Sequence, residues 1–117
     1  MYNYVAKVLK VIDGDTIVAN VDLGFDINVK QTFRFNGINA YETKLGKSTT
    51  IELKAKGIEA KVFLQGLIEG QNVVIQTFKD DKEKYGRYLA TIFIQESQDT
   101  FVNVNELMIK KGYAISM

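Results

Sequence analysis

The stretch VIDGDTI, residues 11–17, joins two runs of β-forming residues through Asp-Gly-Asp. YVAKVLKVI (residues 4–12) lies upstream and TIVANVDL (residues 16–23) downstream. Asp-Gly between such runs is a strong hairpin signal, because a tight primed turn needs positive φ at its centre. Apolar residues recur at every other position of the second run, which predicts a half-buried strand. Its inner face would carry Ile17, Ala19, Val21 and Leu23.

The turn carries one more carboxylate than a hairpin requires. Gly14 and one aspartate are explained by the turn, but Asp13 and Asp15 repel each other unless a positive charge lies between them. Two interpretations stay open from this stretch alone: a solvated turn, which is the commoner case, or a turn that holds a cation.

Composition limits the chemistry. The chain has 117 residues, with 46% hydrophobic and 25% charged residues, which suits one globular domain over residues 1–117. It contains no cysteine and no histidine, so disulfides, histidine-based catalysis and ordinary zinc sites are excluded. No apolar run is long enough to span a bilayer. We therefore expect a soluble domain, monomeric by default, with a cytoplasmic location favoured over secretion.

The first half of the chain predicts strands followed by a helix. Residues 29–35 alternate so that Phe33 and Phe35 point to the core and Arg34 away from it. An irregular stretch, GINAYETKLGKSTT (residues 37–50), follows. A helix is expected from about Ala55 to Glu69, or from an earlier start if Thr49 and Glu52 form a capping box. Its apolar face would carry Ile58, Val62, Phe63, Leu67 and Ile68, and Gly70 would end it.

The second half adds two strands and a short helix. NVVIQTF (residues 72–78) and YLATIFI (residues 88–94) are strand-like. Asn103 and Glu106 can cap a short helix that stops at Gly112. Three strands, a helix, two strands and a short helix are the order of a five-stranded OB-fold barrel, a mainly β, α+β architecture. This order alone is shared with other α+β folds.

Five motifs in a fixed order carry more information than the element order. They are VIDGDT (residues 11–16), TFRFNGINAYETK (32–44), KGIEA (56–60), EKYGRYLA (83–90) and VNELMIKKG (104–112). In this order and spacing they resemble the staphylococcal nuclease family of thermonuclease-like domains. The resemblance extends from about Val11 to Gly112. It implies an OB-fold domain that hydrolyses nucleic acid with calcium.

The resemblance also implies a calcium site. In that family the second aspartate of the turn binds calcium, which would make Asp15 a ligand, with Asp13 directly behind it. The family's Asp-x-Pro-Glu segment supplies a second carboxylate, but this chain has Asn39 there and Tyr41 in place of the proline. The backbone carbonyl of Ala40 would complete the set. An amide oxygen still coordinates calcium but lacks the negative charge, so weaker metal binding is expected.

The remaining carried-over residues would handle the phosphate. The resemblance implies that Arg34 contacts phosphate, that Arg87 stabilises the pentavalent phosphorane, and that Glu42 is the base for the attacking water. Lys84 and Tyr85 would hold the terminal phosphate of the nucleotide. Arginine suits such roles. Each guanidinium group can bind two oxygens of a phosphate, and these hydrogen bonds strengthen as negative charge develops on the phosphate. Taken one at a time, Arg34, Arg87 and Glu42 would more commonly be solvated surface charges, and Tyr85 could equally well pack at the barrel rim.

Two functions follow from these residues. The first is a calcium-dependent phosphodiesterase acting on DNA or RNA, single-stranded nucleic acid above all, that cuts the P–O5′ bond and leaves 3′-phosphates as the family does. The alternative is a degenerate nuclease domain that binds nucleic acid without cutting it, because Asn39 and Tyr41 depart from the family pattern. A net charge of +1 predicts modest affinity that weakens with salt.

Overall fold

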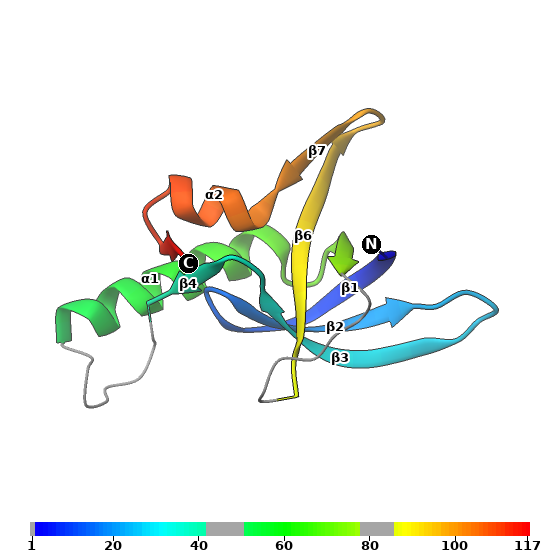
Figure 1. Cartoon of the computed structure of the whole chain (residues 1–117), viewed down its shortest axis with the longest axis horizontal. Helices are drawn as coiled ribbons and strands as arrows, with labels where there is room; N and C mark the ends of the chain where they lie inside the picture. Colours follow the sequence, from blue (N-terminus) through cyan, green and yellow to red (C-terminus); the bar gives the residue numbers. More distant parts are fainter. Residues whose placement is uncertain (1, 42–50, 78–85) are drawn as a thin grey trace.

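The structure is a computed structural model that describes residues 2–41, 51–77 and 86–117. Its elements, in chain order, are β1 (Tyr2–Asp13), β2 (Thr16–Asp22), β3 (Asn28–Phe35), β4 (Ile38–Ala40), α1 (Ile51–Ile68), β5 (Asn72–Thr77), β6 (Tyr88–Ser97), β7 (Thr100–Asn103), α2 (Val104–Lys110) and β8 (Ala114–Ser116). Figure 1 shows the strands crossing one another beside α1, with the β2–β3 and β6–β7 hairpins projecting outward.

Five strands close into a barrel, as the sequence predicted. The main sheet has the order β3-β2-β1-β5-β6-β7, and an additional parallel pairing between β3 and β6 joins the ring. All other pairings in this sheet are antiparallel. The predicted OB-like barrel is confirmed. The strands β4, β7 and β8 were not predicted; β4 and β8 form a separate two-stranded sheet.

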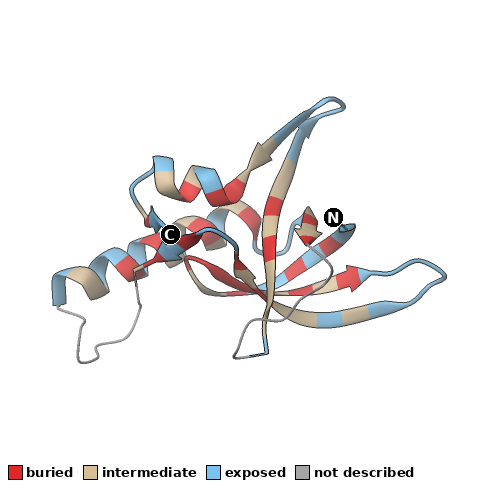
Figure 2. Cartoon of the chain, in the orientation of Figure 1, coloured by how far each residue is buried: buried red, intermediate tan, exposed pale blue. Residues whose placement is uncertain are grey.

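The core follows the period-2 alternation of the strands. Figure 2 shows buried residues alternating with less buried ones along β1, β2 and β6. On β2 the predicted inner-face residues Ile17, Ala19 and Val21 are buried, whereas Leu23 lies beyond the strand and is half exposed. Phe33 and Phe35 of β3 are buried and Arg34 between them is not, as predicted.

Helix α1 begins near the earlier of the two starts that the sequence left open, and only part of its predicted apolar face, Phe63, Leu67 and Ile68, packs on the barrel core. It starts at Ile51, and Gly70 after its end has φ +79°, as expected for a C-terminal stop. The prediction that Ile58 and Val62 are core residues is wrong, because they are 45% and 59% exposed. The residues buried along the helix, three or four positions apart, are Gly57, Ala60, Leu64 and Ile68. Small residues on this face let the helix pack close to the strands.

One buried amide ties α2 to the parallel seam of the barrel. Asn105 accepts a hydrogen bond from the Ile92 N–H (3.1 Å) and donates to the carbonyl oxygens of Ala90 (3.0 Å) and Asn36 (2.9 Å). The predicted cap of α2 is also present, since the Asn103 side chain accepts from the Glu106 N–H at 3.1 Å. Among the described residues, no helix has the length and apolar character needed to cross a bilayer.

Candidate active site

The β1–β2 turn buries one carboxylate. Asp13 ends β1 and Thr16 begins β2, so Gly14 and Asp15 form the turn. Asp15 is only 7% exposed. Its Oδ1 accepts from the Thr16 hydroxyl at 3.0 Å and its Oδ2 accepts from the Ala40 N–H at 2.8 Å. Asp13 is half-buried at the end of β1. The second aspartate of the motif is therefore a fixed interior group and not a solvated turn residue.

Gly14 is required by packing and not by positive φ. The described glycines with positive φ are Gly24, Gly37, Gly70, Gly86 and Gly112. Gly14 is not among them, so the expected primed turn is wrong. A Cβ at Gly14 would lie 2.8 Å from the Cβ of Ala60 and 3.1 Å from that of Ala40. The absence of a side chain lets α1 and β4 meet the turn directly.

Arg34 neutralises the buried carboxylate. Residue pairing between β2 and β3 sets Arg34 opposite Thr16, next to the turn. The Arg34 Nη1 lies 2.9 Å from the Asp15 Oδ2, and the two side chains are 14% and 10% exposed. Nη1 also donates to the carbonyl oxygens of Ile38 (3.2 Å) and Phe35 (3.4 Å). The guanidinium is thus held in one orientation by several acceptors.

The same guanidinium reaches the residue that replaces the family's aspartate. Arg34 Nη2 donates to the Asn39 Oδ1 at 3.1 Å. Asn39 is exposed, whereas its neighbour Ala40 is buried and directs its N–H to Asp15. Oxygen atoms from residues 15 and 39, far apart in the chain, therefore converge on one cationic group.

The Arg34 guanidinium is not saturated by these contacts. A guanidinium has five N–H donors, and the contacts of Arg34 with the other described residues come from Nη1 and Nη2. The Nε–H group takes part in none of them. A guanidinium with a donor left over can add a contact to an anion such as a phosphate.

Arg87 lies directly before the neighbouring strand, β6. β3 and β6 pair in parallel with Leu89 opposite Arg34, and Arg87 is two residues before Leu89. Arg87 therefore enters the strand that pairs with β3 close to the Arg34 position in register. Gly86, with φ +83°, precedes Arg87 and turns the chain into β6.

Three candidate residues lie outside the described residues: Glu42, Lys84 and Tyr85. The described chain ends at Tyr41 before the first gap, and the Lys56 Nζ of α1 lies 5.3 Å from the centroid of the Tyr41 ring. This contact joins the end of the β4 segment to α1. Tyr41 therefore has a packing partner in place of the rigidity that a proline would supply.

Sequence reasoning missed some contributors to the site. Thr16 and the carbonyl oxygens of Phe35 and Ile38 position Asp15 and Arg34, yet only the strand register brings them together. The adjacency of Thr16 to Asp15 was the only signal in the sequence. No cluster of three or more His, Cys, Asp or Glu residues is present in the part of the chain that the structure describes.

Comparison with known proteins agrees with this geometry. A family model described as "Staphylococcal nuclease homologue" matches residues 32–117. The chain belongs to the staphylococcal nuclease family. The predicted family is thereby confirmed. Residues 11–16, which contain the turn aspartates, lie outside the matched range, and the contact of Asp15 with Arg34 joins them to it.

Proteins similar to this chain occur in bacteria and archaea. The chain is 35% identical to an uncharacterized protein of Methanocaldococcus jannaschii, over 96% of this chain and 58% of that protein. It is 37% identical to an uncharacterized protein of Bacillus anthracis, over 93% of this chain and 45% of that protein. It is 32% identical to the thermonuclease of Staphylococcus hyicus, over 92% of this chain and 56% of the thermonuclease. The chain thus spans about half the length of these curated relatives.

Proposed function

We propose that this staphylococcal nuclease-family domain is a calcium-dependent phosphodiesterase that cuts single-stranded DNA or RNA. The observation that carries the proposal is the Arg34 guanidinium, which Asp15, Asn39 and two backbone carbonyl oxygens hold in one orientation while Nε takes part in none of these contacts. An arginine that is oriented in advance and has a donor left over suits an anionic ligand. A phosphodiester is the ligand that we propose for it.

Arg34 and Arg87 would act together on the scissile phosphate. Attack by water turns the phosphodiester into a dianionic, five-coordinate species, and donors that strengthen as this charge develops lower the barrier. Arg34 is already oriented by Asp15 and by two backbone carbonyls, so it loses little freedom when it binds. Arg87, which directly precedes the strand paired with β3, would reach the same phosphate from there.

The oxygens beside Arg34 are of the kind that a hard cation takes as ligands. The Asp15 Oδ2 and the Asn39 Oδ1 both contact the positively charged guanidinium, which supports a role for them beside a cation. Asp15 and Asn39, with the Ala40 carbonyl and with Asp13 behind, would hold Ca²⁺. When bound, the ion would neutralise phosphate charge and orient the attacking water.

The proton acceptor and the flanking contacts rest on the family resemblance. The chain has no histidine, so a carboxylate is the natural group to accept the proton of the attacking water. We assign this role to Glu42, which follows Tyr41 directly. Lys84 and Tyr85 would hold the terminal phosphate of the substrate.

The second candidate function is a nucleic-acid-binding module without cleavage, and Asn39 is the observation that favours it. Asn39 removes one negative charge from the cation site, and its amide oxygen is used by Arg34. Since calcium affinity depends on the charge of the ligands, loss of the ion would leave phosphate binding by Arg34 and Arg87 without hydrolysis.

The two functions differ in a digestion of single-stranded DNA with calcium titrated from micromolar to millimolar. The nuclease proposal expects cleavage that saturates with calcium, falls by about 100-fold or more in Arg87→Ala, and needs less calcium in Asn39→Asp. Lys110→Ala, an exposed cation at the end of α2, is the matched control and should cleave as the unmodified chain does. Binding without cleavage at every calcium level, in both the native chain and Asn39→Asp, would refute the nuclease and establish the module.

A further inference from the structure

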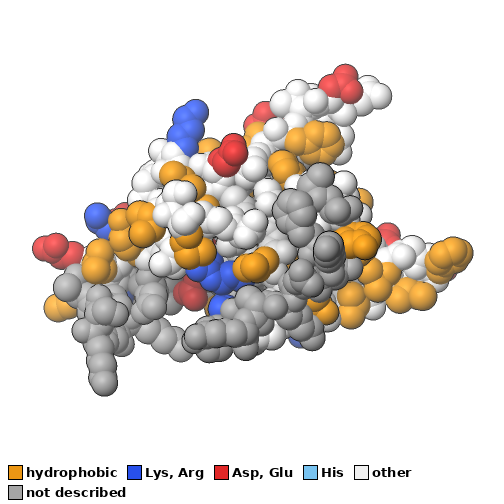
Figure 3. All heavy atoms as spheres, viewed as in Figure 1, with side chains coloured by type: hydrophobic (Ala, Val, Ile, Leu, Met, Phe, Trp, Pro, Cys, Tyr) orange, Lys and Arg blue, Asp and Glu red, His pale blue; other side chains and the backbone are white. Residues whose placement is uncertain are grey.

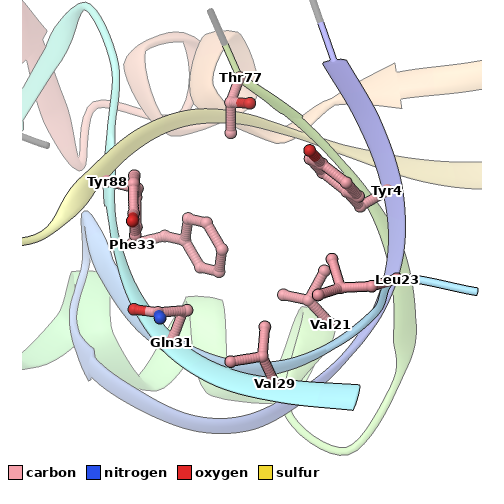
Figure 4. A pocket seen from close by; sticks show the side chains of 8 residues that line it. All are labelled: Tyr4, Val21, Leu23, Val29, Gln31, Phe33, Thr77 and Tyr88. Carbon is pink, nitrogen blue, oxygen red and sulfur yellow. The ribbon is translucent and has the colours of Figure 1, made fainter. Parts of the chain in front are cut away.

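The Arg34 side chain is oriented from the end of β3 and not from the barrel interior. Figure 4 shows the neighbouring residue, Phe33, directed into the cavity inside the barrel. Because alternate residues of a strand point to opposite faces, Arg34 lies outside this cavity. Two of the acceptors of its guanidinium are the carbonyl oxygens of Phe35 (3.4 Å) and Ile38 (3.2 Å). The turn between these two residues therefore determines where the two oxygens lie.

This turn has little packing of its own. It consists of Asn36 and Gly37, which are both exposed, and Gly37 has φ +78°. A Cβ placed on Gly37 would have no atom of another described residue within 4 Å, its chain neighbours aside. The exposed hydrophobic side chains that gather over the β2–β3 hairpin in Figure 3 lie at the opposite end of β3. The geometry of the turn therefore depends on hydrogen bonds to its backbone.

The C-terminal part of the chain supplies two of these hydrogen bonds. The Asn36 carbonyl accepts from Nδ2 of Asn105, on α2, at 2.9 Å. The Gly37 carbonyl accepts from the N–H of Met117, directly after β8, at 3.0 Å. The guanidinium thus binds the outer two of four successive carbonyl groups, and the C-terminal part of the chain binds the inner two.

Asn105 is itself fixed before it reaches the turn. It is only 4% exposed, its Oδ1 accepts from the Ile92 N–H at 3.1 Å, and its Nδ2 also donates to the Ala90 carbonyl at 3.0 Å. The Asn36 N–H donates to the same Ala90 carbonyl at 2.8 Å. β6 therefore sets the direction in which the Asn105 amide meets the turn.

Pairing with β8 secures the far side of the same turn. Asn39 of β4 is paired with Ile115, and Ala40 with Ala114. The strand that contacts Arg34 and the turn that orients it are thus held by one part of the chain, residues 103–117. That part contains no residue to which the proposed function gives a contact with the phosphate or the cation.

We infer that Asn105 and the N–H of Met117 are positioning groups for Arg34. By fixing the turn they fix the two carbonyl oxygens that orient the guanidinium, and hence the direction in which it meets a phosphate. The inference rests on the proposed function for that phosphate. Without either group the turn and the guanidinium sample other orientations, so fewer encounters are aligned for reaction even though Asp15 still attracts the charge.

The test crosses each positioning group with Arg34 in a mutant cycle. Met117→Pro removes the N–H, and the preceding Ser116 already lies in a strand, the conformation that a proline requires there. We expect Met117→Pro to lower kcat/KM for calcium-dependent cleavage of single-stranded DNA by about threefold to tenfold. Asn105→Leu should lower it by about tenfold to a hundredfold. In the Arg34→Ala background, measured with enzyme in excess, neither substitution should lower it further.

Two controls separate positioning from general stability, with every variant assayed at a temperature where it is folded. Met117→Ala keeps the N–H, and Asn103→Ala removes only the cap of α2, so both should match the native chain. If Asn105→Leu does not fold, Met117→Pro decides, because Met117 is 70% exposed. A loss of the same size with and without Arg34 would overturn the inference, since the substitution would then act through another part of the site.

A second measurement needs no cleavage. The NMR order parameter of the Arg34 Nε–H group reports how tightly the guanidinium is held. It should fall in Met117→Pro and stay at the native value in Met117→Ala. An unchanged order parameter in both Met117→Pro and Asn105→Leu would overturn the positioning role and leave the nuclease in place. If the native chain leaves DNA uncut, the nuclease proposal fails and the order parameter alone decides this inference.

Discussion

Replacing Gly14 with alanine tests the close contact on which the turn depends. The added Cβ would lie 2.8 Å from the Ala60 Cβ, whereas carbon atoms in good contact are about 3.5–4.0 Å apart. The Ala60 carbonyl carbon is 3.5 Å behind it, so helix backbone and not a flexible side chain must move. Overpacking of this kind costs about 1–3 kcal/mol. At roughly 4 °C per kcal/mol, Gly14→Ala should lower Tm by about 4–12 °C.

The assay is thermal and urea unfolding of a double-mutant cycle with Ala60→Gly. Ala60→Gly alone should cost about 1 kcal/mol from helix propensity. Ala60→Gly removes the Cβ atom with which the new Cβ of Gly14→Ala would collide. The free energy of unfolding of the double variant should therefore be about 1–2 kcal/mol higher than the sum of the two single losses predicts. Gly66→Ala is the control: nothing lies within 4 Å of its Cβ, so it should gain about 0.5–1 kcal/mol. Additivity of the cycle within about 0.5 kcal/mol would refute the steric reasoning.

Two further stability predictions concern Asn105 and the β2–β3 hairpin tip. Asn105→Leu should cost roughly 3 kcal/mol in urea unfolding, because it leaves the buried Ile92 N–H without its acceptor and removes one of the two donors to the Ala90 carbonyl oxygen, which keeps the Asn36 N–H. Asn103→Ala removes only a helix cap and should lower the free energy of unfolding by about 1 kcal/mol. A larger loss of stability in Asn103→Ala than in Asn105→Leu would contradict this ranking. Phe25 has φ +54° and is 97% exposed, so Phe25→Asn should gain about 0.5–1 kcal/mol in the same assay. Destabilisation there would mean that Phe25 packs against something.

The barrel was predictable because its strands follow period-2 alternation. Ile17, Ala19 and Val21, and Phe33 with Phe35, are buried as the pattern indicated. Strand β4 was not predictable, since three residues are too few to show a period. The face of α1 was mispredicted for a different reason. A close approach selects small residues such as Ala60, which a search for large apolar side chains passes over.

The sequence indicated the members of the site more clearly than their contacts. Asp15 and Arg34 were assigned separately, to a cation and to a phosphate, yet in the structure they form an ion pair. The pair depends on the β2–β3 register, which sets Arg34 opposite Thr16, and on the fold of β4, which delivers the Ala40 N–H and Asn39. Neither can be inferred from residue types alone. The roles of Glu42, like those of Lys84 and Tyr85, stay predictions.

The central claim is that Arg34 and Arg87 bind one phosphate beside Asp15. The most direct test measures kcat/KM for calcium-dependent cleavage by three variants: Arg34→Lys, Arg87→Lys and the double variant. Lysine keeps the charge but not the bidentate fork. The geometry predicts a loss of about 100-fold or more for each single variant, and a double loss smaller than the product because the two act as a unit. A folded single variant that keeps the native kcat/KM would contradict it.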